Sequence, residues 1–208
     1  MRKMCIAPGY LESDFPDGVS DEQRMKLFFK GIGGWFLDVA DECINPQPQR
    51  SLAAHPGFAV LSIVFSYFEI IAKCQDGYQG RDKSHQYFAE GVLSVFPELR
   101  ESPEGEVLVE LLYFGARNGL YHCCMPDSLI VISGTYPLPL QLDTINNRMR
   151  AGINPHLLVS ALIHHLKQYE EQCLNTENIR ARGCLLSRLN YQASESKKVE
   201  ERLRKKGK

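Results

Sequence analysis

The chain has 208 residues, of which 44% are hydrophobic and 24% charged, so it can bury a substantial core and is expected to form one domain with appendages. The net charge of −1 hides an asymmetry. Residues 175–208 carry ten basic and four acidic side chains, a net of +6, which leaves fourteen basic and twenty-one acidic side chains, a net of −7, in residues 1–174.

The composition argues against a membrane protein. The longest apolar run, residues 57–72, is interrupted by Glu69 and is shorter than the roughly 20 residues needed to cross a bilayer. Residues 1–15 lack an uninterrupted apolar segment of signal-peptide length before acidic residues appear. We therefore expect a soluble, cytoplasmic protein with no membrane partner.

The first predicted helix begins at a capping box, in which Ser20 is followed three residues later by Gln23. Apolar residues then recur at helical spacing as far as Cys43, and the sequence NPQPQ at 45–49 ends the helix. A second helix is expected over residues 56–74 and is almost wholly apolar. Its polar residues fall in one stripe, at intervals of four, three and four: Ser62, Ser66, Glu69 and Lys73.

Two more helices and a hairpin are expected in the middle of the chain. A glycine-rich connection leads to a third helix over residues 84–96, which Pro97 closes. A fourth helix is expected over residues 104–122. After it, two short β-prone runs within 129–142, separated by a turn at 134–137, predict a small hairpin.

Asn154 is a predicted cap for a further helix, with Pro155 at the first helical position, and this helix is expected to end near Cys173. Residues 175–208 have a short apolar patch followed by an end rich in Glu, Lys and Arg, which we interpret as a mobile or marginal helix. The sequence thus predicts a mainly α protein, an antiparallel helical bundle in residues 1–174 with a small hairpin and a basic, partly flexible tail.

Cysteines and paired histidines offer no metal site. Cys123 and Cys124 follow His122, but adjacent side chains diverge along a chain and fit poorly around one centre. His164 and His165 point about 100° apart on a helix, so we expect surface positions for both. No C-x-x-C pair occurs, and we expect reduced thiols, no metal and no cofactor. The seven cysteines are Cys5, Cys43, Cys74, Cys123, Cys124, Cys173 and Cys184.

The end of the fourth helix has the sequence RNGLYH, which places Arg117 and His122 five positions apart. On an ideal helix Asn118 shares a face with His122, whereas Arg117 lies about 140° from it. Gly119 can loosen the last turn, and the long arginine side chain can swing toward the imidazole. We therefore expect both side chains to reach one cleft.

Spacing alone does not define a site, because Arg50 and His55 stand at the same separation in an evident loop. At 117–122 the context is a long apolar helix, preceded by a buried helix whose stripe contains Glu69. With the hexapeptide RNGLYH, this combination resembles the HEPN superfamily, helical bundles in which Arg, four to six residues and His end the last core helix. The likeness in arrangement covers roughly residues 21–172, and in sequence only the hexapeptide and its apolar lead-in.

The resemblance implies a metal-independent endoribonuclease or RNA-processing protein of a toxin or defence system, acting as a dimer, with Arg117, Asn118 and His122 as catalytic residues. Glu69, from its stripe, and Tyr121, beside the histidine, are added as binding residues. A histidine with a pKa of about 6.5 can exchange a proton, and an arginine fork matches phosphate oxygens. Attack by a 2′-hydroxyl would confine the reaction to RNA.

One position departs from the family pattern. Members that act as toxins opposite a nucleotidyltransferase antitoxin often have a tyrosine two residues after the histidine, where this chain has Cys124. Control by modification of that tyrosine is therefore not expected here.

Two glycines suggest how copies of the chain would meet. Gly115 and Gly119 fall in line with His122, and two glycines four residues apart allow another backbone to approach closely. We therefore expect a homodimer built around the helix 104–122, in which each glycine groove faces its twin and both motifs line one cleft.

Purely structural interpretations of these residues stay open. His122 either belongs to a site or caps the helix end, and Glu69 either joins that site or is a solvated residue at the polar edge of its helix. The basic tail either binds RNA, folds over the acidic body or solubilises the chain. The alternative for the whole chain is a non-catalytic helical module that binds a nucleotide or a protein partner such as an antitoxin.

Overall fold

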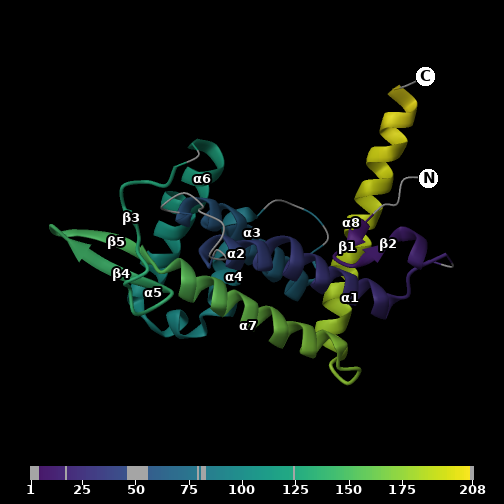
Figure 1. Cartoon of the computed structure of the whole chain (residues 1–208), viewed down its shortest axis with the longest axis horizontal. Helices are drawn as coiled ribbons and strands as arrows, with labels where there is room; N and C mark the ends of the chain where they lie inside the picture. The colour runs from purple at the N-terminus through teal and green to yellow at the C-terminus, as the bar shows by residue number, and fades with distance from the viewer. Residues whose placement is uncertain are drawn as a thin grey trace.

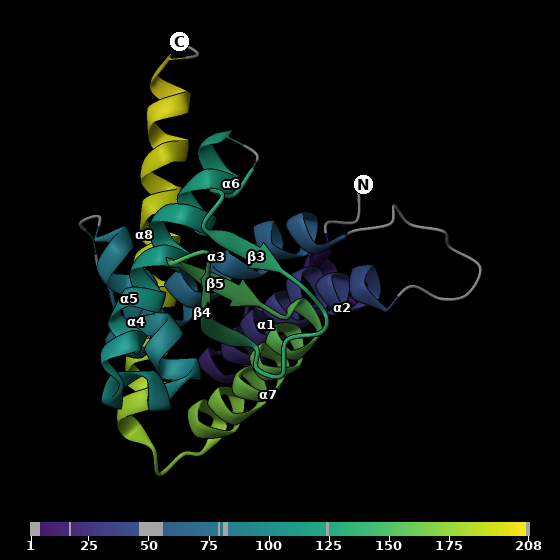
Figure 2. The ribbon, with the colours of Figure 1, turned by 90° about the vertical axis from the view of Figure 1, so that its left-hand side faces the viewer.

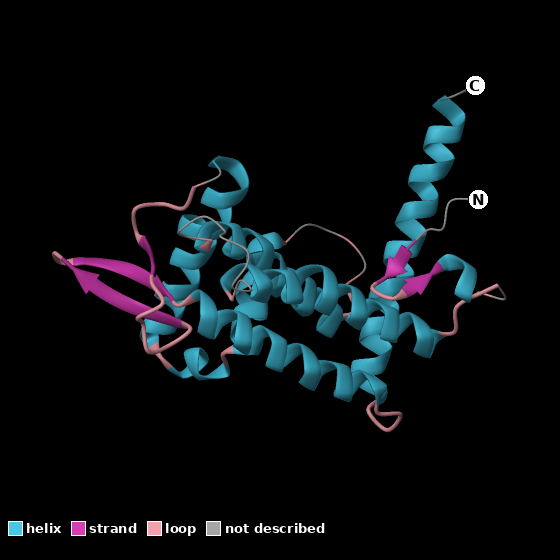
Figure 3. Cartoon of the chain, in the orientation of Figure 1, coloured by secondary structure: helices cyan, strands magenta, loops and turns pink. Residues whose placement is uncertain are grey.

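A computed structural model of the chain describes residues 5–16, 18–45, 56–78, 80, 83–123 and 125–206, and most of this part is helical (Figure 3). The helices lie along one another, with a small sheet at one end of the molecule and the C-terminal helix at the other (Figure 1). The mainly α class predicted from sequence is confirmed. Arg50, His55, Cys124 and most of the NPQPQ segment lie outside the described residues.

The N-terminal segment forms two short strands that the sequence did not predict, β1 (Cys5–Ala7) and β2 (Tyr10–Leu11), and a 3-10 turn, η1 (Glu12–Asp14). The strands pair antiparallel. The first predicted helix follows, with the expected capping box: the backbone N–H of Ser20 donates to Gln23 Oε1, and that of Gln23 donates to Ser20 Oγ.

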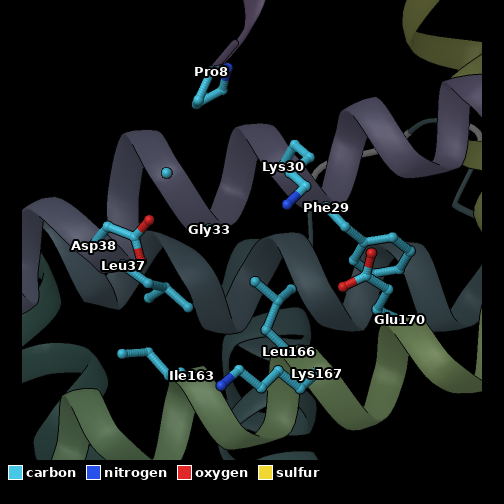
Figure 4. A pocket seen from close by; sticks show the side chains of 11 residues that line it. Pro8, Phe29, Lys30, Gly33, Leu37, Asp38, Ile163, Leu166, Lys167 and Glu170 are labelled. Carbon is cyan, nitrogen blue, oxygen red and sulfur yellow. The ribbon is translucent and has the colours of Figure 1, made fainter.

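This first helix runs through α1 (Asp21–Ile32), a π-helical turn η2 (Gly33–Leu37) and α2 (Asp38–Ile44). The wide turn lies beside α7, and a pocket of about 280 Å³ opens between them (Figure 4). Leu37 and Leu166 line its apolar part, and charged side chains surround it in Figure 4.

The central element of the bundle is α3 (Gly57–Asp76), half of whose residues are buried. Val60, Val64, Phe65, Phe68 and Ile71 are fully buried. By length and composition alone α3 could cross a bilayer, because the helix continues to Asp76, beyond the apolar run at 57–72. It packs instead at the centre of the bundle, against α2, α4, α7 and α8, and the arrangement is compatible with a soluble protein.

The motif lies on a nearly continuous helix that begins after α4 (Ser84–Val95) and the 3-10 segment η3 (Pro97–Glu101). It runs through α5 (Pro103–Glu110), the π-helical segment η4 (Leu111–Arg117) and α6 (Asn118–Cys123), close to the predicted range 104–122. The π-helical segment ends at Arg117, so this residue stands where the helix changes its pitch. Such segments often occur at functional sites.

The predicted hairpin at 129–142 is wrong. The two β-prone runs form β3 (Ile130–Ile132) and β4 (Leu140–Ile145), but they do not pair with each other. A third strand, β5 (Arg148–Ile153), lies between them, parallel to β3 and antiparallel to β4. The hairpin is β4–β5, and its two-residue turn is Asn146–Asn147, both at positive φ, a conformation that asparagine tolerates.

The predicted cap at Asn154 is confirmed, because its side chain accepts hydrogen bonds from the backbone N–H groups of His156 and Leu157 at the start of α7 (Pro155–Leu174). The tail forms a long helix, α8 (Ile179–Lys206). Its first half packs against α1, α3 and α7 and buries Leu185, whereas its second half extends away from the bundle (Figures 1 and 2). A domain boundary at residue 174 stays a prediction.

The expected surface position is wrong for His165. Its Nδ1 lies 2.7 Å from the Tyr67 hydroxyl and its Nε2 lies 3.1 Å from Ser94 Oγ, so the ring joins α7 to α3 and α4. His164 is exposed, as expected. Burial, with a smaller effect from His164, lowers the pKa of His165 from 6.5 to about 4.

This low pKa makes the stability of the fold depend on pH. Between about pH 6.5 and 4 the unfolded chain binds a proton at His165 that the folded chain does not bind, so the free energy of unfolding falls as the pH falls through this range. We expect a His165→Gln variant to be less stable at pH 7 but to lose less stability between pH 7 and 5. Urea unfolding at several pH values measures both slopes, and a His164→Gln variant is the matched control, with a slope close to that of the wild type because His164 makes the smaller contribution to the shift. Equal slopes for all three proteins would contradict the assignment of this pH dependence to His165.

Candidate functional site

Arg117 points from the end of the π-helical segment toward α3. Its Nη2 lies 2.7 Å from Glu69 Oε1, and its Nε–H donates to the same oxygen at 3.0 Å. Both side chains are largely shielded from water, with 18% of the Arg117 side chain and 12% of the Glu69 side chain exposed. The two residues are 48 positions apart in the sequence, so this ion pair ties the motif helix to the central helix.

Glu69 is the centre of the polar cluster. Its Oε2 accepts a hydrogen bond from Ser84 Oγ at 2.6 Å and lies 3.4 Å from Lys73 Nζ. A buried carboxylate is stable only when it is paired and hydrogen-bonded, and here two cations and a hydroxyl meet that need. The interpretation of Glu69 as a solvated residue at the helix edge is therefore wrong.

The remaining contacts of Arg117 hold its guanidinium in place. Nη1 donates to Asn118 Oδ1 at 2.9 Å, and Nη2 donates to Ser84 Oγ at 3.3 Å. The guanidinium carbon lies 4.8 Å from the centre of the Tyr121 ring and 5.4 Å from that of Tyr113, within the range of cation–π attraction. Four other side chains therefore restrain Arg117 in addition to Glu69.

Tyr121 closes this cluster on the outer side. Its ring lies against Arg117, and its hydroxyl donates to the backbone carbonyl of Ser62 at 3.3 Å. Burial raises the pKa of Tyr121, so its hydroxyl stays protonated and acts as a donor at neutral pH. Glu69 of the polar stripe predicted on α3 therefore faces the end of η4, and Tyr121 of α6 reaches the α3 backbone at Ser62.

His122 stays outside the cluster. It is exposed, and within the described part of the chain it forms no hydrogen bond or ion pair. The interpretation of His122 as a cap that bonds the last helix carbonyls is therefore not supported. Of the residues predicted from sequence, the structure brings together Glu69, Arg117, Asn118 and Tyr121, and it leaves His122 at the solvent-facing end of α6.

The glycine groove does not face a second copy. An added Cβ on Gly119 would lie 2.6 Å from the carbonyl oxygen of Met125, and one on Gly115 would lie 3.2 Å from Ile130 Cδ1. Asp127 also donates its backbone N–H to the carbonyl of Gly115 at 2.8 Å. The chain's own segment after α6 therefore covers this face, and the proposed route to a homodimer through the glycines is wrong. Whether the protein dimerises elsewhere is a separate prediction.

The structure adds three residues to the cluster that sequence reasoning did not assign to it. Lys73 was visible as a member of the polar stripe, four residues after Glu69, which is a common spacing for an ion pair on a helix. Tyr113 lies four residues before Arg117 on the same helical segment, so its spacing also gave a signal. Ser84 gave none, because only the packing of α4 against α3 places it beside Arg117.

Within the described part of the chain the cluster has no metal centre, and the pocket of Figure 4 lies elsewhere. Among the described residues, no group of three or more His, Cys, Asp or Glu side chains is placed to hold a metal ion. The pocket in Figure 4 lies between η2 and α7, and its described lining residues include no member of the motif. Comparison with known proteins finds no significant match to a protein family, to a curated protein or to a solved structure.

A substitution at Gly119 tests whether the segment after α6 covers the face of the helix that carries Gly115 and Gly119. We expect Gly119→Ala to lower the free energy of unfolding by about 1–3 kcal/mol, because its methyl group overlaps backbone atoms of Met125 and Pro126. Gly183→Ala is the matched control, since an added Cβ there meets nothing within 4 Å, and it should stabilise α8 by about 0.5–1 kcal/mol. Chemical denaturation measures both. A Gly119→Ala protein of unchanged stability but altered oligomeric state would contradict this account and support the glycine-based dimer expected from sequence.

Proposed function

We propose that the chain is a HEPN-like, metal-independent endoribonuclease or RNA-processing protein of a defence or toxin–antitoxin system in the cytoplasm. The observation that carries the proposal is the Glu69–Arg117 pair at the motif helix, with Asn118 bound to the same guanidinium and His122 open to solvent one turn further on. Under this proposal the bundle is the HEPN type, and the partners are RNA, a second copy of the chain and an antitoxin or other partner protein.

The chemistry divides between a fixed cation and an accessible base. RNA cleavage without a metal needs a base for the 2′-hydroxyl proton, a cation for the phosphorane charge and an acid for the leaving oxygen. His122 is exposed, and its imidazole can accept or donate a proton. Arg117, Lys73 and Glu69 together carry a net charge of +1, which favours a phosphate at this surface.

The second candidate is a non-catalytic helical module that binds a nucleotide or a protein partner. The observation that favours it is the engagement of Arg117, whose guanidinium is already bound by Glu69, Ser84 and Asn118. In this reading the ion pair stabilises the bundle. The acidic body points the same way, because non-specific RNA affinity normally comes from Lys and Arg that face phosphates.

Incubation of the purified protein with mixed RNA separates the two candidates. For a ribonuclease we expect His122→Ala to lower the cleavage rate by roughly 10²-fold or more, because it removes the proton-transfer group, and we expect EDTA to have no effect. His164→Ala, at another exposed histidine, is the matched control and should cleave at the wild-type rate.

Two results would contradict the ribonuclease proposal. One is activity that is lost in EDTA and restored by magnesium. The other is equal cleavage by the wild type and the His122→Ala protein, which would trace the activity to a contaminant. A wild-type protein that cleaves no RNA but binds nucleotides would favour the module.

A further inference from the structure

An apolar groove lies at the end of the molecule away from the sheet, between the first helix and α8. Its volume is about 640 Å³, and Leu27, Phe28 and Ile70 line its floor while Leu189 of α8 forms one wall. Trp35 and Phe36, on the wide η2 turn, border the opening, and the Trp35 side chain is 48% exposed. Val39 continues this apolar surface onto α2 and is also exposed.

The second half of α8 carries a matching apolar stripe. Leu189, Gln192 and Ser196 line the groove, and continuing their spacing of three and four residues leads to Val199 and Leu203. Residues three and four apart share one face of a helix. Val199 is 51% exposed and Leu203 is 64% exposed, on a stretch where every residue from Ser196 to Lys205 is exposed (Figure 1).

The charged residues that line the groove, Arg24 and Arg188, are basic, whereas the neighbouring α2 is acidic. Residues 194–206 contain six basic and three acidic side chains, a net of +3. Beside Trp35 and Val39, the α2 helix carries Asp38, Asp41 and Glu42 and has no basic residue. A basic amphipathic helix on the Trp35 and α2 side of the groove is therefore matched by its apolar stripe and by the acidic residues of α2, and this chain itself supplies such a helix.

We propose that the groove bordered by Trp35 and Phe36 binds the second half of α8 from another copy of this chain. The exchange is reciprocal, because each copy offers one groove and one extending helix, as a two-fold dimer requires. The two α8 helices then run antiparallel, with the small residues Ala193 and Ser196 near the two-fold axis, where they allow a close approach. Val199 and Leu203 of each copy cover Trp35 and Leu189 of the other.

This contact is independent of the proposed ribonuclease function. It uses η2, α2 and α8, none of which belongs to the Glu69–Arg117 cluster, and α8 lies at the end of the molecule opposite α6 (Figure 1). It also differs from the glycine-based dimer expected from sequence, whose surface is covered by the chain's own segment 125–130. A protein that cleaves no RNA would leave this proposal intact. A protein that does not dimerise through α8 would leave the ribonuclease proposal intact.

Trp35 is the only tryptophan in the chain and reports directly on the contact. We expect the full-length protein to form dimers in sedimentation experiments, and its fluorescence emission to shift to longer wavelength on dilution as Trp35 becomes exposed. A V199S/L203S variant should raise the dimer dissociation constant roughly 30-fold or more, because two apolar side chains are lost from the interface. Both positions are exposed in the single chain, so its folding should not change.

An E200S/R204S variant is the matched control. It introduces the same two serines into the same part of α8, at exposed positions outside the stripe, and leaves the net charge unchanged. It should dimerise with an affinity within a few fold of the wild type. The proposal is overturned by a wild-type protein that stays monomeric at high micromolar concentration, or by a V199S/L203S protein that dimerises as tightly as the wild type with the same Trp35 emission. Equal loss of affinity in both variants would also overturn it, because the stripe would then have no special role.

Discussion

The buried carboxylate of Glu69 is the constraint around which the motif region is arranged. It lies on the central helix α3, where an unpaired charge would be costly, and three groups from three other places in the sequence meet its two oxygens. Arg117 comes from the motif helix, Ser84 from the start of α4 and Lys73 from the next turn of α3. The ion pair thus fixes how the motif helix lies against the core.

This arrangement separates the two residues that the sequence motif places together. Arg117 is held inward by Glu69 and between the rings of Tyr113 and Tyr121, whereas His122 is left at the exposed end of α6. Under the ribonuclease proposal, one phosphate would have to reach both the restrained Arg117 and the exposed imidazole of His122. The same restraint suits a structural ion pair in a binding module. A measurement of RNA cleavage distinguishes the ribonuclease from the binding module.

Features set by local sequence could be predicted, and features set by distant packing could not. The capping box at Ser20, the polar stripe on α3 and the cap at Asn154 each depend on residues within one or two helical turns. The position of β5 between β3 and β4 depends on a parallel pairing across about twenty residues, which local sequence does not show, although its sequence, RMRAGI, alternates as a strand does. The filled glycine face, the half-buried His165 and the contact of Arg117 with Glu69 likewise follow from tertiary packing. The HEPN resemblance of the motif stays a prediction.

The central claim is that Glu69 and Arg117 form one energetic unit, and a double-mutant cycle on the free energy of unfolding tests it most directly. The proteins are the wild type, Glu69→Gln, Arg117→Gln and the double variant. Glu69→Gln should cost about 3–5 kcal/mol because it leaves Arg117 without its carboxylate, and Arg117→Gln should cost less because Glu69 keeps Lys73 and Ser84. The double variant should be more stable than the sum of the single losses predicts, by about 2 kcal/mol. Losses that add within about 0.5 kcal/mol would contradict the account, because the two side chains would then act independently.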